Sequence, residues 1–182
     1  MARISYSDDT NIPQALGLKG NVNLLRIVYQ SPKIGKTFAD FFAAEPAGLS
    51  LSPKLRELLI LHTAWNTQSE YAWMLHQEIA RSAGVTDAQL ASIQQGQIQS
   101  FVFNEKEKNL LQFLSRIAAS ESLSRDYFEE ARKHFSDREL VEIVAVQGFY
   151  CTIATLASVF ELEIDSSWSE GPTCGESYIH PA

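Results

Sequence analysis

The chain has 182 residues, of which 45% are hydrophobic and 20% charged, the balance of an ordinary globular protein rather than a disordered one. Its formal net charge is −7 at pH 7 and it has no run of Lys and Arg, which argues against nucleic-acid binding because phosphates attract a basic surface. Cys151 and Cys174 supply neither a disulfide framework nor a metal-ligand spacing. We therefore expect a soluble, cytoplasmic protein that binds neither nucleic acid nor membrane.

Helix-start signals recur along the chain. Ser52-Pro53 combines a capping serine with a proline in the first turn, where the missing N–H costs no hydrogen bond. Thr67 followed by Glu70 predicts a capping box that opens another helix, and Gly84 ends it. The expected helices are, in chain order, Asn21–Tyr29, Ile34–Ala44, Ser52–Trp65, Thr67–Ala83, Thr86–Gln95, Asn104–Ala119, Ser124–His134 and a last one opened by the Ser136–Glu139 capping box.

The segment Leu140–Phe160 holds 21 mostly apolar residues, about the length that spans a bilayer. Glu142 and Gln147 interrupt it and no basic anchors flank it, so we interpret it as the buried central helix of a soluble bundle. Strand signals hardly appear. The pattern predicts an all-α, single-domain helical bundle over residues 1–165, followed by an irregular tail, 166–182.

His76 falls within a largely apolar face of the helix expected over Thr67–Ala83. Ser69, Ala72 and Trp73 share that face by the three-and-four spacing of a helix. An imidazole in such a stripe costs free energy unless it has a polar partner. It is either a core histidine satisfied by a neighbouring group or a functional one.

Glu57, on the preceding helix, is a candidate partner. Apolar residues follow it at helical spacing, so its carboxylate is expected to point towards apolar surroundings. A glutamate and a histidine on adjacent helices of a hairpin could shuttle a proton. Alternatively, Glu57 pairs with Lys54 or Arg56 at the surface.

The stretch from Arg56 to His76, RELLILHTAWNTQSEYAWMLH, resembles the core of the carboxymuconolactone decarboxylase superfamily, which includes alkylhydroperoxidase D. The alkylhydroperoxidase D branch carries a glutamate, then a C-x-x-C, then a histidine four residues after the second cysteine. Counted back from His76, the cysteine positions fall on Ser69 and Ala72, and the glutamate position falls on Glu57. The resemblance implies an alkylhydroperoxidase D-like bundle around a central helical hairpin, in a cysteine-free subgroup.

The missing cysteines bear directly on activity. A dithiol peroxidase needs one thiolate to attack the peroxide and a second thiol to resolve it, and Ser69 and Ala72 can do neither. The resemblance instead implies acid–base chemistry without metal or organic cofactor. His76 would carry the proton, Glu57 would orient or relay it, and Ser69 would donate a hydrogen bond to a substrate oxygen. Aromatic residues at such spacing usually belong to the core. We nevertheless expect the substrate site to be lined by Trp65, Asn66, Tyr71, Trp73 and His62.

Two functions stay open at this point. The first is a cofactor-free lyase or isomerase that acts on a small carboxylate or lactone; the second is a non-catalytic or redox-accessory protein that kept the fold and lost the thiols. Retention of both Glu57 and His76 favours the first. No tight metal-ligand spacing occurs, so no metal site is expected. The apolar helix Leu140–Phe160 predicts a homo-oligomer, and the resemblance implies trimers or hexamers.

Overall fold

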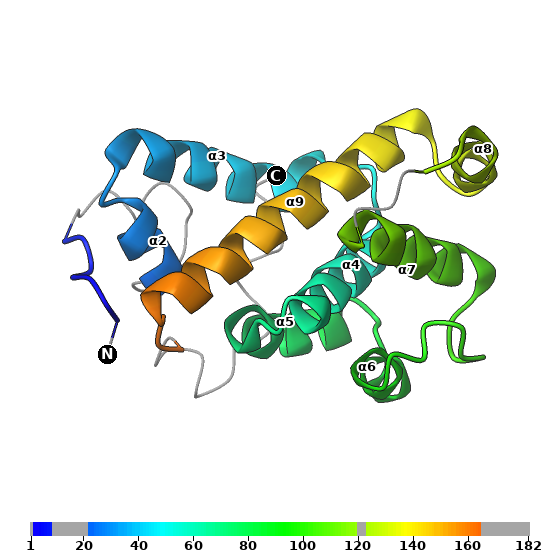
Figure 1. Cartoon of the computed structure of the whole chain (residues 1–182), viewed down its shortest axis with the longest axis horizontal. Helices are drawn as coiled ribbons and strands as arrows, with labels where there is room; N and C mark the ends of the chain where they lie inside the picture. Colours follow the sequence, from blue (N-terminus) through cyan, green and yellow to red (C-terminus); the bar gives the residue numbers. More distant parts are fainter. Residues whose placement is uncertain (1, 9–21, 120–122, 165–182) are drawn as a thin grey trace. The chain divides into compact units, whose positions relative to one another are not determined.

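The computed structural model describes residues 2–8, 22–119 and 123–164, and these segments form eight α-helices and no strand (Figure 1). The helices account for more than half of the chain, so the prediction of an all-α fold is confirmed. The expected tail, 166–182, lies outside the described residues, as does Cys174. The helices are α2 (Asn23–Val28), α3 (Pro32–Gly48), α4 (Pro53–Asn66), α5 (Glu70–Ser82), α6 (Asp87–Gln94), α7 (Glu105–Ala118), α8 (Arg125–Arg132) and α9 (Asp137–Phe160).

The chain packs into two compact units. One is Ser50–Ala154, with α4 to α8 and most of α9; the other combines Met1–Leu49 with Thr155–Ala182. The sequence contains no linker and predicts a single domain. The chain passes from one unit to the other twice, once between α3 and α4 and once inside α9, and the sequence carries a linker signal at neither place.

Helix α4 is the central helix of the Ser50–Ala154 unit. It packs against α5, α6 and α7. Its consecutive residues Leu58 to Leu61 are all fully buried, so the helix is covered on every side rather than along one stripe. The buried polar side chains Glu57 and His62 of α4 therefore face other helices instead of water.

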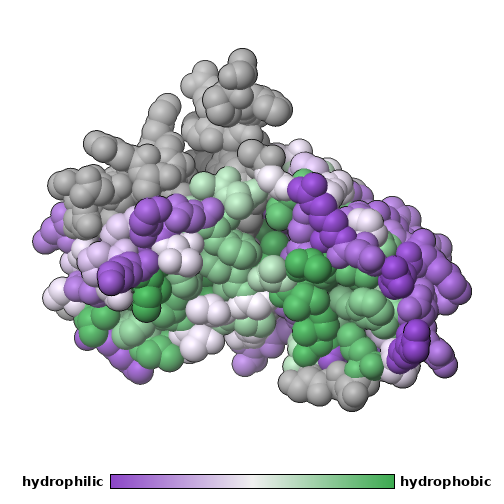
Figure 2. Space-filling model, turned by 90° about the horizontal axis from the view of Figure 1, so that it is seen from above, coloured by the Kyte–Doolittle hydropathy of each residue, from purple (hydrophilic) through white to green (hydrophobic). Residues whose placement is uncertain are grey.

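Helix α9 is buried on one side only within this unit. Ile143 and Val146 belong to the core, whereas Val141 and Val144 are 69% and 48% exposed. The expectation of a buried central helix therefore holds for one side of α9, and the other side is exposed in this chain. Figure 2 shows hydrophobic residues at the molecular surface beside hydrophilic ones. By length and composition α9 could cross a membrane, a test that the core helix of a soluble protein also passes.

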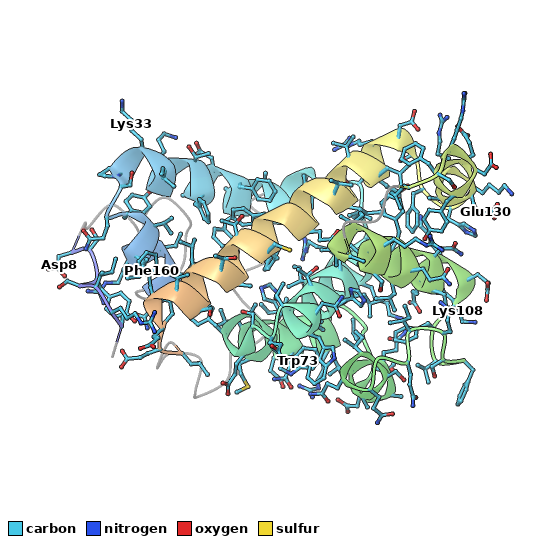
Figure 3. The ribbon with its side chains drawn as sticks, in the orientation of Figure 1. Asp8, Lys33, Trp73, Lys108, Glu130 and Phe160 are labelled. Atoms are coloured by element: carbon cyan, nitrogen blue, oxygen red, sulfur yellow. The ribbon has the colours of Figure 1, made fainter. Side chains whose placement is uncertain are left out.

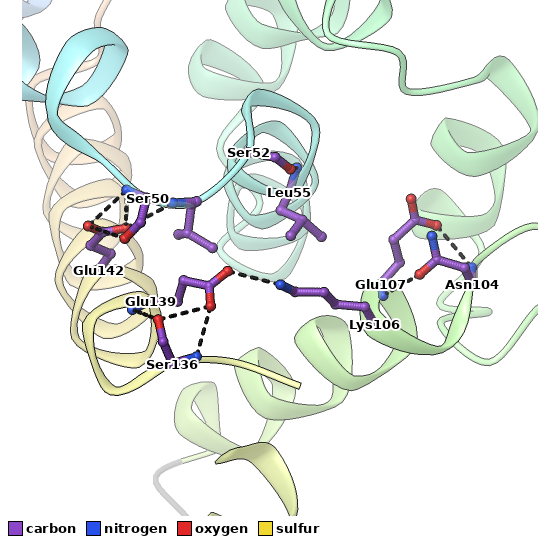
Figure 4. A network of polar contacts seen from close by, with 10 residues as sticks. Ser50, Ser52, Leu55, Asn104, Lys106, Glu107, Ser136, Glu139 and Glu142 are labelled. Atoms are coloured by element: carbon purple, nitrogen blue, oxygen red, sulfur yellow. Dashed lines mark hydrogen bonds and ion pairs between the residues drawn. The ribbon is translucent and has the colours of Figure 1, made fainter. Parts of the chain in front are cut away.

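Most of the predicted capping signals are present. Ser52 caps α4, Thr86 and Asn104 form capping boxes at α6 and α7, and Ser136 exchanges hydrogen bonds with Glu139 at α9 (Figure 4). The box predicted at Thr67 is wrong. Its hydroxyl donates to the carbonyl oxygen of Thr63, 2.8 Å away, and Ser69 caps α5 in its place.

Glu142 ties the segment before α4 to α9 (Figure 4). Its carboxylate accepts hydrogen bonds from the backbone N–H groups of Ser50 and Leu51, at 2.8 and 3.0 Å, and from the guanidinium of Arg138 at 2.9 Å. Burial alone would raise the pKa of this carboxyl, but the hydrogen bonds outweigh burial and hold the pKa below its usual value. Glu142, which interrupts the apolar segment in the sequence, thus holds α9 to the segment before α4.

The second unit is organised around a tyrosine. Tyr29 packs with Leu25 and Ala39 in a small buried cluster. Its ring lies so close to Gly35 of α3 that a Cβ atom there would be 2.5 Å from a ring carbon. Glycine at this position therefore permits the close contact between the Tyr29 ring and the backbone of α3.

Candidate active site

The site is built on the antiparallel hairpin of α4 and α5. Glu57, early in α4, meets His76 in the later part of α5, while Trp65 near the end of α4 meets Trp73 near the start of α5. The turn between the helices places Gln68 in the left-handed region, with φ of 54°. The hairpin predicted from the sequence is confirmed.

Glu57 and His76 are joined directly. The Nδ1 atom of His76 lies 2.8 Å from Oε2 of Glu57. The Glu57 side chain is 1% exposed, whereas that of His76 is 14% exposed. The other carboxylate oxygen of Glu57 accepts a hydrogen bond from Nε of Arg56 at 3.2 Å. The alternative pairing with arginine therefore exists too, but at a buried carboxylate and alongside the histidine.

Tyr150 of α9 completes the contacts of the imidazole. Its hydroxyl lies 3.2 Å from Nε2 of His76, and the two rings meet edge to face with centroids 5.1 Å apart. An ionised carboxylate can only accept, so Nδ1 carries a hydrogen towards Glu57. In the neutral imidazole Nε2 then accepts the hydrogen bond from the phenol. Tyr150 was not among the residues predicted for the site, although a tyrosine one turn after Gln147 is a second polar position on that side of the apolar helix.

Ser69 stands at the start of α5. Its Oγ accepts a hydrogen bond from the backbone N–H of Ala72 at 3.3 Å, so the two positions that hold cysteines in the thiol branch are linked here by a helix cap. A hydroxyl carries a hydrogen besides its acceptor lone pairs, and the cap leaves Ser69 able to donate. Ser69 is buried.

His62 and Asn66 face other partners. Nε2 of the buried His62 lies 3.1 Å from the hydroxyl of Ser115 on α7, and the amide nitrogen of Asn66 lies 3.3 Å from its Nδ1. Ser115 donates its own hydrogen to the carbonyl oxygen of Leu111, so Nε2 of His62 is the donor in this pair. Burial lowers the pKa of His62 to about 4, which keeps it neutral at pH 7. These hydrogen bonds group His62 with α7 instead of with the Glu57–His76 pair.

The aromatic residues of the hairpin differ in exposure. Trp65 is 41% exposed and meets the largely buried Trp73 edge to face, with centroids 5.7 Å apart. Figure 3 labels Trp73 on α5. Tyr71 is buried. Of the predicted substrate-binding residues, Trp65 is therefore the aromatic side chain most open to solvent.

Thiol and metal groups are sparse at this site. Cys151 follows Tyr150 on α9 and is half-buried, and burial raises the pKa of its thiol, which disfavours the reactive thiolate. Within residues 2–8, 22–119 and 123–164, no three His, Cys, Asp or Glu side chains lie close enough together to hold a metal ion.

The helical hairpin and its Glu–His pair can be compared with those of known protein families. The family-model match and the solved structures described below support a relationship to the superfamily of carboxymuconolactone decarboxylase and AhpD-like proteins. The sequence model of the Carboxymuconolactone decarboxylase family matches residues 32–116, a little under half of the chain and including the whole hairpin. The comparison with curated proteins gave no match.

Solved structures share the fold over most of their length. The debrominase Bmp8 has a TM-score of 0.71 and 17% identity, covering 91% of this chain and 92% of that one. A protein of unknown function from Agrobacterium tumefaciens, proposed to be the antioxidant defence protein AhpD, has a TM-score of 0.68 and 22% identity, covering 81% and 99%. An uncharacterized peroxidase-related protein from Silicibacter sp. TM1040 has a TM-score of 0.71 and 19% identity, covering 86% and 82%. At these identities the likeness shows the fold alone.

Proposed function

We propose that the protein is a cofactor-free acid–base enzyme of the lyase or isomerase type that acts on a small carboxylate or lactone. His76 is the proton carrier and Glu57 its partner. The observation that carries this proposal is the 2.8 Å contact between a buried carboxylate and an imidazole that is still partly open to solvent. A histidine kept only for packing would not need a charged partner in the core.

The geometry suits delivery of a proton. Decarboxylation breaks the bond from carbon to the carboxylate, and the electron pair moves into the conjugated lactone as CO₂ leaves. A carbon of the resulting dienolate then takes a proton from His76, which regains one from water. Glu57 stabilises the imidazolium that carries this proton, because the carboxylate accepts its Nδ1–H. Ser69 would donate to a substrate oxygen.

A small cyclic substrate is supported by one of the solved structures. A cysteine-to-alanine variant of the debrominase Bmp8 was crystallised with 2,3,4-tribromopyrrole, and it shares 18% identity and a TM-score of 0.68 with this chain. That protein has a cysteine to replace, whereas this chain has Ser69 and Ala72 at the C-x-x-C positions. Thiol chemistry like that of a peroxidase is therefore not part of the proposal.

Turnover of a lactone panel tests the proposal. The protein is incubated in D₂O with 4-carboxymuconolactone and related small unsaturated lactone acids, and loss of CO₂ with gain of deuterium is followed by NMR. His76→Ala should lower the rate by about 10²–10⁴-fold, the usual cost of losing a general acid–base group. His62→Gln is the matched control, because it removes a buried imidazole that is bonded to α7 and should keep the rate.

The alternative, a non-catalytic accessory protein, makes a different forecast. Glu57→Gln and His76→Ala would then lower the melting temperature, since each leaves a buried polar group without its partner, and ligand binding would not change. Turnover that survives His76→Ala, or no turnover of any compound in the panel, would favour this alternative.

A further inference from the structure

Both ring nitrogens of His76 are occupied. Nδ1 faces the Glu57 carboxylate at 2.8 Å and Nε2 faces the Tyr150 hydroxyl at 3.2 Å. A carboxylate only accepts hydrogen bonds, so it holds a hydrogen on Nδ1 whether the ring is neutral or charged. The nitrogen that gains and loses a proton is therefore Nε2. Tyr150 stands at that atom.

A phenol can serve both states of this nitrogen. While His76 is neutral, the O–H group of Tyr150 donates to the Nε2 lone pair. When Nε2 takes up a proton, the new N–H bond can donate to the phenol oxygen, provided that the O–H bond turns away. Neither state leaves Nε2 unpaired, which avoids the cost of an unsatisfied buried group. A carbonyl oxygen at the same place could only accept and an ammonium could only donate, so either group could pair with Nε2 in one protonation state only.

We propose that Tyr150 is a positioning residue of the acid–base site, an inference that rests on the proposed function. Its hydroxyl holds Nε2 of His76 and reverses the direction of their hydrogen bond each time the histidine gains or loses a proton. His62 shows the contrast. Its Nε2 donates to Ser115, whose hydroxyl hydrogen is directed to the carbonyl oxygen of Leu111. The Nδ1 atom of His62, the nitrogen that would take up a proton, faces the amide nitrogen of Asn66, which can only donate, so this arrangement suits the neutral ring alone.

His62 and His76 should therefore be opposite tautomers, and NMR can show it without a substrate. Protein labelled with ¹⁵N-histidine is studied in long-range ¹H–¹⁵N spectra at neutral pH, with signals assigned from His62→Gln and His76→Gln. We expect the hydrogen of neutral His76 on Nδ1 and that of His62 on Nε2. Tyr150→Phe keeps the ring that packs on the imidazole and removes only the hydroxyl, so the Nε2 signal of His76 should move while the His62 signals stay.

Tyr29→Phe is the matched control, since it removes a phenol hydroxyl from a buried tyrosine of the other unit and should move neither histidine. On a lactone that is turned over, Tyr150→Phe should lower kcat by about 10–100-fold and leave KM within about twofold, as when partners that orient metal-ligating imidazoles are removed. An unchanged Nε2 signal, or His76 with its hydrogen on Nε2, would overturn the inference.

The two proposals can fail separately. A shifted Nε2 signal without turnover of the panel would support the positioning contact and count against the proposed function. Turnover with an unchanged Nε2 signal and unchanged kcat in Tyr150→Phe would overturn the positioning role alone.

Discussion

Acid should weaken this protein through His62 before it protonates the carboxylates. Burial lowers the pKa of His62 from 6.5 to about 4, so the unfolded chain takes up a proton in a pH range where the folded protein does not. The free energy of unfolding that the neutral, buried His62 contributes is complete above pH 6.5. It falls as the pH drops and is lost near pH 4. It amounts to about 3 kcal/mol over the whole range, and to about 2 kcal/mol between pH 7 and pH 5.

Urea unfolding at pH 7 and pH 5, followed by circular dichroism, measures this loss in wild type and in His62→Gln. Glutamine can still donate to the Ser115 hydroxyl but does not titrate, so wild type should lose about 2 kcal/mol more than the variant between the two pH values. Ser115→Ala should keep most of the wild-type pH dependence, because burial rather than the hydrogen bond lowers the pKa. Equal pH dependence in wild type and His62→Gln would refute the reasoning.

Four further outcomes are expected. Glu142→Ala should reduce the free energy of unfolding by about 2–3 kcal/mol, measured by urea titration, because backbone N–H groups lose their charged acceptor; an unchanged midpoint would contradict this. Gly35→Ala should cost about 1–3 kcal/mol in the same assay, since its Cβ would overlap a tyrosine ring. A Cβ at Gly148 would meet no atom within 4 Å, so Gly148→Leu should keep the fold but block close approach of a second copy to α9; light scattering should show a homo-oligomer for wild type and a smaller species for the variant, and a wild-type monomer would exclude the oligomer. Replacing Cys151 and Cys174 with serine should leave lactone turnover intact, and a folded but inactive double variant would show that the thiols matter.

Local signals along the chain predicted most helix starts. Ser52, Thr86 and Ser136 cap helices as expected because a cap involves only residues three positions apart. Thr67 shows where such a signal fails. Its hydroxyl can either accept a hydrogen bond from a backbone N–H further along the chain or donate one to the carbonyl oxygen of Thr63 on the helix that is ending, and it donates to Thr63. Spacing alone does not rank two hydrogen-bond partners that lie about equally near in the sequence.

The candidate site was predictable only in part. Glu57 and His76 could be paired because two helices joined by a short turn must run side by side, and each carries its polar residue on the apolar face. Tyr150 lies 74 residues from His76, and no periodicity says which side of α9 meets α5. The assignment of His62 depended likewise on which neighbour covers that side of α4, and the answer, α7, comes from packing.

The length of the chain between Glu57 and His76 matters as much as the identity of these two residues. The paired atoms of Glu57 and His76 belong to residues 19 positions apart, and the connection between their helices includes Gln68 in a left-handed conformation. One residue inserted in the first turn of α5, ahead of His76, would rotate the imidazole by about 100° around the helix axis and advance it by about 1.5 Å, away from the carboxylate. A gain or loss of a single residue there would therefore separate the pair while leaving both helices intact.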